Sequence, residues 1–200
     1  MTREVEFFFD FGSTASYLAY TQLPTIAQHC GASILWRPML LGGVFKATGN
    51  SSPVNIPAKG RWMKEDLDRW ARRYGVTFAF NPYFPINTLT LMRGAVAMQL
   101  YQPDAFAQYV DVIFKAMWAS PRNLGDATVL KETLEKARFD GERFMTWVSD
   151  PEVKSRLIAN TEEAVARGAF GAPTFFVGKQ MFFGQDRMDF VREALERVTS

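Results

Sequence analysis

The chain has 200 residues, of which 48% are hydrophobic and 22% charged, and its formal net charge is +2 at pH 7. This composition predicts a folded globular protein, and the near balance of 23 basic and 21 acidic residues gives no basis for a nucleic-acid or anionic-membrane partner. One histidine and one cysteine, His29 and Cys30, exclude an internal disulfide and zinc sites built from several such ligands, so we expect no metal.

The first predicted elements form a strand–helix–strand unit. Hydrophobic residues alternate with others over residues 5–11, a period of two that is typical of a strand. A helix is predicted over residues 13 to about 30, ended by Gly31, and a second strand over residues 33–38. Such a unit favours parallel strands joined by a right-handed crossover.

The middle of the chain is predicted to be mostly helical. Residues 41 to about 57 are rich in Gly, Ser, Asn and Pro, and we expect a long loop there. Helical patterns then continue to Gly168, in segments near residues 59–74, 88–101, 103–118, 128–137, 141–148 and 151–167.

Strand character returns near the end of the chain. Residues 174–177 and 180–183 flank Gly178-Lys179, which predicts a tight hairpin. A last helix is expected from near Arg187, with Asp186 as its N-cap.

Neither strand-bearing end of the chain can bury a core alone, so we predict one sheet built from both ends. The fold class is therefore α/β, with a thioredoxin-like domain and a large all-helical insertion. The predicted boundaries are residues 1–40 plus 169–200 for the thioredoxin-like domain and residues 41–168 for the insertion.

Ser13 is the first candidate functional residue, because it lies where a strand ends and a helix begins. Unpaired amides and the helix dipole favour an anion at such a position. Ser13-x-x-Ser16 keeps the spacing of a redox Cys-x-x-Cys motif without its sulfur. The alternative is that Ser13 serves only as an N-cap.

The second candidate is the segment Gly171-Ala172-Pro173-Thr174, which directly precedes a strand and looks like the cis-proline loop of thioredoxin folds. A cis bond before Pro173 would present the backbone of Ala172 as an open edge for a peptide. An ordinary trans proline at the start of an edge strand is the alternative.

Gln185 and Asp186 form the third candidate, at the expected start of the last helix. A carboxylate there can bind an ammonium group, while spare amides bind a carboxylate. Helix capping alone is the alternative interpretation of Asp186.

The three segments together resemble the kappa-class glutathione transferases and the bacterial 2-hydroxychromene-2-carboxylate isomerases over essentially the whole chain. The motifs that carry the resemblance are FDFGSTASY at residues 9–17, GAPTFF at residues 171–176 and GQDR at residues 184–187. The family usually has proline after the first serine, where this chain has Thr14, next to the expected second-substrate pocket.

The resemblance implies that glutathione is the cofactor and that Ser13 is the catalytic residue, hydrogen-bonded to the glutathione sulfur. It also implies that the rest of the tripeptide is bound by Asn50, Ala172, Pro173, Gln185 and Asp186. The aromatic residues of the insertion, Trp62, Phe80, Tyr83 and Phe84, are expected either to line a substrate pocket or to pack in the core.

The implied activity is glutathione-dependent cis–trans isomerisation of 2-hydroxychromene-2-carboxylate, or of a related small aromatic compound, in naphthalene degradation. Two alternatives stay open: a kappa-like glutathione transferase or peroxidase acting on other electrophiles, and a non-catalytic binder of glutathione or an apolar ligand. The resemblance implies a homodimer. The lone cysteine, the lack of a signal-peptide pattern and the lack of a long apolar run predict a cytoplasmic protein.

Overall fold

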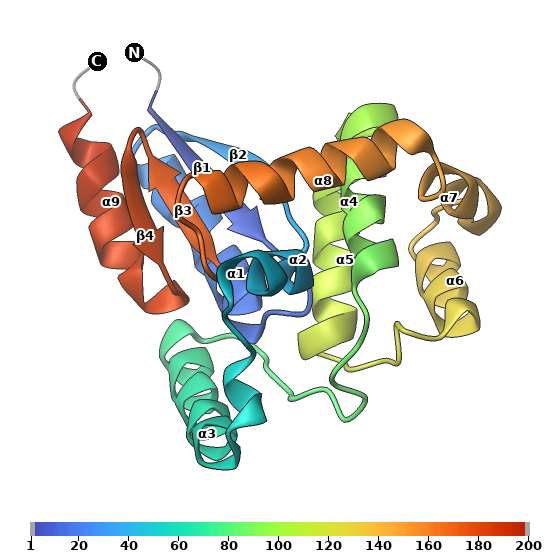
Figure 1. The fold of residues 1–200 in the computed structure, drawn as a ribbon, viewed down its shortest axis with the longest axis horizontal. Helices are drawn as coiled ribbons and strands as arrows, with labels where there is room; N and C mark the ends of the chain where they lie inside the picture. Colours follow the sequence, from blue (N-terminus) through green and yellow to red (C-terminus); the bar gives the residue numbers. More distant parts are fainter. Residues whose placement is uncertain (1–2, 199–200) are drawn as a thin grey trace.

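The computed structural model describes residues 3–198, and its strands form a four-stranded sheet drawn from both ends of the chain (Figure 1). Strand β1 (Glu4–Phe9) pairs in parallel with β2 (Ser33–Pro38) and antiparallel with β3 (Thr174–Val177). The hairpin partner of β3 is β4 (Gln180–Phe183), which gives the order β2-β1-β3-β4. The prediction of one sheet built from both ends of the chain is confirmed.

One face of the sheet is covered by α1 (Thr14–His29) and α9 (Met188–Arg197). Phe7 and Phe175 lie on adjacent strands of this face, with ring centroids 5.2 Å apart, and both are fully buried. Aromatic pairs of this kind contribute about 0.5–1.5 kcal/mol beyond the burial of their area. The alternating pattern of β1 therefore fixes which side of the sheet faces these helices.

The opposite face is covered by α2 (Leu41–Thr48) and α8 (Pro151–Ala166), which cross in front of the sheet in Figure 1. Phe8 and Phe176 form the core of this face, together with small and aliphatic residues of the two helices. Both faces of the central strands are thus buried, and the ends of the strands remain as the open rim of the sheet.

The predicted helices are confirmed, with small shifts of their ends. Within the part of the chain that the structure describes, no helix is long and apolar enough to cross a membrane. The predicted division into a thioredoxin-like domain (residues 1–40 plus 169–200) and an inserted helical domain (residues 41–168) stays a prediction. The remaining helices are α3 (Pro57–Tyr74), α4 (Leu89–Tyr101), α5 (Phe106–Trp118), α6 (Ala127–Lys136) and α7 (Gly141–Trp147), with 3-10 turns η1 (Pro53–Asn55), η2 (Pro103–Ala105) and η3 (Gln185–Arg187).

The expected long loop over residues 41–57 was wrong, because residues 41–48 form α2. The Leu41 amide donates to the Asp10 carboxylate at 2.8 Å, and Val44 is fully buried against the sheet. Gly49 then ends the helix in a left-handed conformation at φ 70°. Tertiary contacts with the sheet therefore outweigh the weak helix propensity of a glycine-rich segment.

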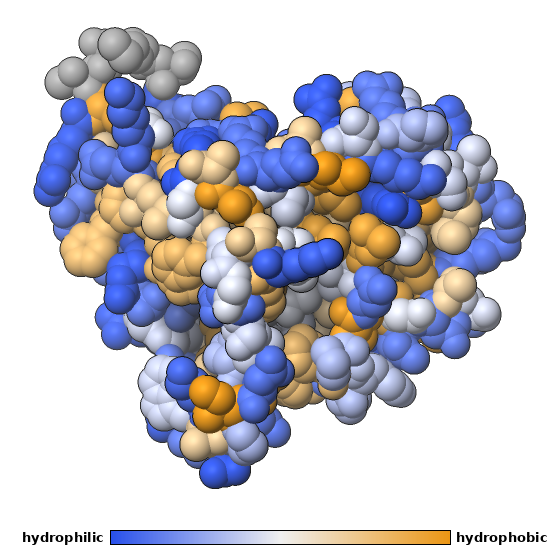
Figure 2. All heavy atoms as spheres, in the orientation of Figure 1, coloured by the Kyte–Doolittle hydropathy of each residue, from blue (hydrophilic) through white to orange (hydrophobic). Residues whose placement is uncertain are grey.

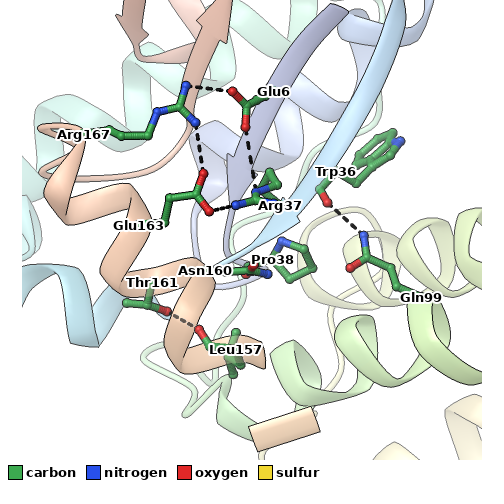
Figure 3. A network of polar contacts seen from close by, with 10 residues as sticks. All are labelled: Glu6, Trp36, Arg37, Pro38, Gln99, Leu157, Asn160, Thr161, Glu163 and Arg167. Atoms are coloured by element: carbon green, nitrogen blue, oxygen red, sulfur yellow. Dashed lines mark hydrogen bonds and ion pairs between the residues drawn. The ribbon is translucent and has the colours of Figure 1, made fainter. Parts of the chain in front are cut away.

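A network of charges fixes the end of α8 against the sheet (Figure 3). Arg167 lies 2.7 Å from Glu6 on β1 and 3.2 Å from Glu163 on α8, and Glu163 also pairs with Arg37 on β2. The Arg167 guanidinium stacks on the ring of Phe176 at 3.7 Å from its centroid. The network joins β1, β2 and the end of α8. Arg167 lies four residues before Gly171, where the candidate proline loop begins.

Candidate functional site

Ser13 begins α1, as predicted, and also contacts the candidate proline loop. Its backbone is extended, and its Oγ accepts a hydrogen bond from the Ser16 amide at 3.0 Å, so the N-cap is confirmed. The same hydroxyl donates to the carbonyl oxygen of Ala172 at 3.0 Å. Ser13 therefore does more than cap a helix, since it joins the start of α1 to a segment 159 positions away.

The first turn of α1 has free hydrogen-bond donors beside this hydroxyl. Among residues 3–198, no acceptor is found for the amides of Thr14 and Ala15. These donors lie at the positive end of a helix of 16 residues. Such an end attracts negative charge with about 0.3–1 kcal/mol, and up to about 2 kcal/mol where it is partly buried.

The proline loop has the predicted conformation, with a cis peptide bond between Ala172 and Pro173. Thr174 secures the loop by donating its hydroxyl to the Gly171 carbonyl at 2.8 Å. The Gly184 amide donates to the Pro173 carbonyl at 3.0 Å, which ties the loop to the third candidate segment. Within the described range, the Ala172 amide has no acceptor, so this edge is open to a ligand.

Asn50 reaches the same loop from the end of α2. Its Nδ2 donates to the carbonyl oxygen of Phe170 at 2.8 Å, and its side chain is exposed. Phe170 lies two residues before Ala172. The structure therefore brings Ser13, Asn50 and the proline loop together, although they lie in separate parts of the sequence.

Gln185 is buried beneath Tyr74, the last residue of α3. The Tyr74 hydroxyl lies 2.8 Å from Gln185 Oε1 and 3.1 Å from the Gln185 carbonyl oxygen. Burial, with the nearby Asp186 carboxylate as a smaller cause, raises the pKa of Tyr74 to about 12. The hydroxyl is thus a permanent donor at neutral pH and orients the Gln185 side chain.

The predicted N-cap role of Asp186 was wrong. Asp186 lies inside η3, and the N-cap of α9 is Arg187, which makes no capping bond from its side chain. The Asp186 carboxylate pairs instead with the Arg187 guanidinium at 2.6 Å and is exposed. The 3-10 turn shifts the N-cap of α9 by one residue, from Asp186 to Arg187, and the carboxylate is left at the surface of the site.

Asp10 is a residue that the sequence analysis did not single out. Its carboxylate is buried and accepts from the amides of Gly12 and Leu41, each at 2.8 Å, and from the Thr88 hydroxyl. Burial raises the pKa of this carboxyl above its usual 3.8, and the amide bonds offset part of the effect. Asp10 thus ties the turn before Ser13 to the starts of α2 and α4. An acidic residue between two phenylalanines, directly after a buried strand, is the signal that could have found it.

The lone cysteine lies at the other end of α1 from Ser13. Cys30 is buried, and burial raises the pKa of its thiol. Seventeen residues of helical rise place it on the order of 25 Å from Ser13. His29 bonds only to the Thr25 carbonyl. Across residues 3–198, no cluster of His, Cys, Asp or Glu has the arrangement of a metal site.

The aromatic residues of the insertion divide between surface and core. Trp62 and Tyr83 are more than half exposed, whereas Phe80 and Phe84 pack against the buried Trp118. Core packing therefore accounts for two of the four, as one of the alternatives expected.

Comparison with known proteins finds relatives that match this chain over most of its length. The model of the DSBA-like thioredoxin domain matches residues 4–196. A 2-hydroxychromene-2-carboxylate isomerase of Sphingobium xenophagum is 31% identical over 197 residues, which cover 98% of this chain and 99% of that protein. Glutathione S-transferase kappa 1 of Rattus norvegicus is 27% identical, covering 94% of this chain and 88% of that protein.

The structural comparison agrees with the sequence comparison. A solved structure of a 2-hydroxychromene-2-carboxylate isomerase superposes with a TM-score of 0.85 at 31% sequence identity. The superposition covers 98% of this chain and 95% of that chain. The helices between the two halves of the sheet are therefore shared with that protein as well as the sheet itself.

Proposed function

Since this chain belongs to the DSBA-like thioredoxin family, in the group that contains 2-hydroxychromene-2-carboxylate isomerases and kappa-class glutathione transferases, we propose that it is a glutathione-dependent isomerase. The proposed substrate is 2-hydroxychromene-2-carboxylate or a closely related aromatic carboxylate. We also propose that the protein acts as a cytoplasmic homodimer, as the family resemblance implies.

One observation carries the proposal: the site has an anion-binding cradle and no thiol of its own. The Ser13 hydroxyl and the free amides of Thr14 and Ala15 gather where thiol–disulfide enzymes of this fold place a reactive cysteine. Cys30 is buried at the far end of α1. A nucleophilic sulfur at this position must therefore come from a bound molecule.

The residues at the site fit glutathione. The open amide of Ala172 offers a partner for a peptide backbone, and Asn50 lies beside the same loop. Gln185 and the exposed Asp186 offer an acceptor pair for the α-amino group of the γ-glutamyl end. When bound there, glutathione supplies the thiol that the site lacks.

Ser13 and the helix end are sufficient to hold a thiolate at neutral pH. A charge-assisted hydrogen bond contributes roughly 1.5–3 kcal/mol, and the helix N-terminus adds about 0.3–1 kcal/mol. One pKa unit corresponds to 1.36 kcal/mol, so together these contacts lower the pKa of a thiol from about 8.5 by about one to three units. No histidine base is needed for this ionisation.

The isomerase is favoured over a transferase by the higher identity to the isomerases, 31% against 27%. The two activities differ in the fate of glutathione, because an isomerase returns it unchanged and a transferase consumes it. Purified protein should be assayed with 2-hydroxychromene-2-carboxylate, with and without glutathione, and the products should be identified by mass spectrometry. Turnover that requires glutathione without consuming it supports the proposal. Adduct accumulation supports the transferase, and binding without turnover supports a non-catalytic binder.

A further inference from the structure

A pocket of about 460 Å³ lies between α2, α4 and α8, and its lining includes neither Ser13 nor the proline loop. This volume is within the usual range for small-molecule sites. In the space-filling view, hydrophobic side chains gather on the face where these three helices meet (Figure 2). Among the described residues no aromatic ring lines the pocket, so its walls match an aliphatic chain. The apolar part of the lining is formed mainly by Leu40, Ala47, Leu89, Leu157, Ile158 and Val165.

One wall of the pocket carries an arginine without a partner. Arg93 on α4 has a buried Nε that finds no hydrogen-bond acceptor in the described part of the chain, and its guanidinium forms no ion pair there. The other charged residues of the lining, Lys154 and Glu162, both belong to α8, and Glu162 is exposed to solvent. The lining therefore carries one net positive charge.

An unpaired, partly buried guanidinium favours an anionic ligand. A buried polar group without a partner has lost its hydration and gained no hydrogen bond in return, which costs the protein free energy. A carboxylate can accept two hydrogen bonds from one guanidinium, in the geometry that arginine favours. An aliphatic body with a single carboxylate therefore matches both the apolar walls and Arg93.

Helix α2 connects this pocket to the turn that carries Ser13. Leu40 lines the pocket, and the amide of the next residue, Leu41, donates to the Asp10 carboxylate at 2.8 Å. The Asp10 carboxylate also accepts from the Gly12 amide at 2.8 Å, and its carbonyl accepts from the Ser13 amide at 3.0 Å. The start of α2 therefore contacts the residue that holds the turn at the start of α1.

The other end of α2 leads to Asn50. Ala47 lines the pocket, and Gly49 caps the helix directly before Asn50. The Asn50 side chain donates to the Phe170 carbonyl at 2.8 Å, beside the proline loop. Because α2 has only eight residues, including two glycines, it is too short to be stable by itself in water. Its order therefore depends on the contacts that it makes with neighbouring elements.

We infer that this pocket is a regulatory site for an aliphatic monocarboxylate, which pairs with Arg93, orders α2 and thereby tightens the binding of glutathione. The pocket exists only while α2 is docked beside α4 and α8, so a ligand bound in it favours the docked state. In that state Asp10 and Asn50 make their contacts around the glutathione site. The ligand lies apart from Ser13 and does not react. Only the effect on glutathione rests on the proposed function.

Binding to the pocket can be measured without glutathione. The probe is octanoate, titrated calorimetrically into the whole protein, with 1-octanol as its neutral counterpart. Arg93→Met should weaken octanoate binding at least about tenfold, because a charge-assisted hydrogen bond is lost, and should leave octanol binding within about twofold. Hexanoate should bind the wild type about tenfold more weakly than octanoate, since fewer methylenes are buried. The matched control Arg156→Met, on α8 but outside this pocket, should leave the affinity for octanoate unchanged.

The regulatory effect has two readouts. Saturating octanoate should tighten glutathione binding at least about fivefold, within the range typical of coupling between two sites. It should also slow amide hydrogen exchange in residues 41–48, which reports the ordering of α2 in the absence of glutathione. Neither effect should occur in Arg93→Met at the octanoate concentration that saturates the wild type, although this variant should bind glutathione alone as the wild type does.

The outcomes separate this inference from the proposed function. Equal octanoate affinity in the wild type and Arg93→Met would overturn the inference, as would octanoate binding that changes neither exchange in α2 nor glutathione affinity. Octanoate that binds through Arg93 and slows exchange in α2 supports the site even if glutathione does not bind, an outcome that refutes only the proposed function. Glutathione-dependent isomerisation with a glutathione affinity that octanoate leaves unchanged would keep the proposed function and refute the inference.

Discussion

The Ser13 hydroxyl lies 3.0 Å from the carbonyl oxygen of Ala172 and donates its single proton to it. The same oxygen accepts from the Ser16 amide at 3.0 Å, so rotation about χ1 would cost the helix its cap. The proton alone can be redirected while the oxygen stays in place. A bound anion at the start of α1 therefore competes with the Ala172 carbonyl for one proton, within a site that is otherwise held rigid.

Substitution of Ser13 by alanine removes this donor. We expect Ser13→Ala to raise the pKa of bound glutathione by one to two units, because a charge-assisted hydrogen bond is worth roughly 1.5–3 kcal/mol. The variant should also lose about 0.5–2 kcal/mol of stability through the missing N-cap. Thiolate absorbance at 240 nm, followed as a function of pH, measures the first effect, and urea unfolding measures the second.

The control for this experiment is Ser16→Ala. The Ser16 hydroxyl is buried and has no hydrogen-bond partner within residues 3–198. Its removal should leave the glutathione pKa unchanged and cost little stability. Equal thiol pKa values in both variants and the wild type would remove Ser13 from the mechanism.

Tyr74→Phe tests whether the buried Gln185 needs its partner. Without the hydroxyl, Gln185 Oε1 is left unsatisfied, and we expect glutathione to bind about threefold to tenfold more weakly. The Tyr74 pKa of about 12 means that this loss should be constant from neutral pH to about pH 9. Tyr83→Phe, at an exposed tyrosine, should leave the affinity unchanged. Equal glutathione affinity in Tyr74→Phe and wild type would show that Gln185 is held by its other contacts.

Asp10→Asn should show a pH-dependent effect on stability. The carboxyl of Asp10 has a pKa above its usual 3.8, so the native state holds this proton more tightly than the unfolded state does. The wild type therefore loses stability as pH rises from about 3.8 through the native pKa, whereas the amide variant has no such loss. The variant is destabilised at low pH by about 1–3 kcal/mol, because one buried amide loses its acceptor.

We therefore expect the stability gap between Asp10→Asn and the wild type to narrow as pH rises. Urea unfolding of both proteins at about pH 3.5, 5 and 7 measures the gap. A gap that widens with pH would mean that the ionised carboxylate is favoured in the native state, opposite to the direction of its pKa.

The sheet and the main motifs could be predicted from the sequence because their signals are local. The alternation of β1, the Gly178-Lys179 hairpin and the loop before Pro173 each depend on neighbouring residues. In contrast, α2 depends on contacts with Asp10 and the sheet, which lie far away in sequence. Composition alone therefore predicted a loop in its place.

Side-chain partners across the fold were beyond prediction for a similar reason. Asp186 has the sequence position of an N-cap, but the 3-10 turn of η3 shifts the helix start and Arg187 becomes its partner. Tyr74 and Gln185 are 111 positions apart, and no periodic pattern links them.

Gly94 on α4 packs closely against other side chains, although the sequence shows only a glycine within a helix. A Cβ added there would lie 2.2 Å from the Tyr109 hydroxyl and 2.5 Å from the Phe144 ring, both fully buried. The Tyr109 hydroxyl donates to the Leu91 carbonyl at 2.8 Å, so moving the ring also breaks a buried hydrogen bond. Overpacking of a core costs typically about 1–3 kcal/mol, which exceeds the gain of about 1 kcal/mol from replacing glycine by alanine in a helix.

Gly94→Ala should therefore be less stable than the wild type by about 1–3 kcal/mol, measured as a lower urea midpoint at an unchanged slope. Gly42→Ala is the matched substitution, since Gly42 lies inside α2 and the added Cβ has no atom within 4 Å beyond its chain neighbours and the nearby backbone of its own helix. It should raise stability by about 0.5–1 kcal/mol through helix propensity alone. Both substitutions add the same methyl group to a helix. If they change the free energy of unfolding in opposite directions, the contact of α4 with Tyr109 and Phe144 is the cause of the destabilisation in Gly94→Ala. A stabilised Gly94→Ala variant would show that these rings move aside at little cost.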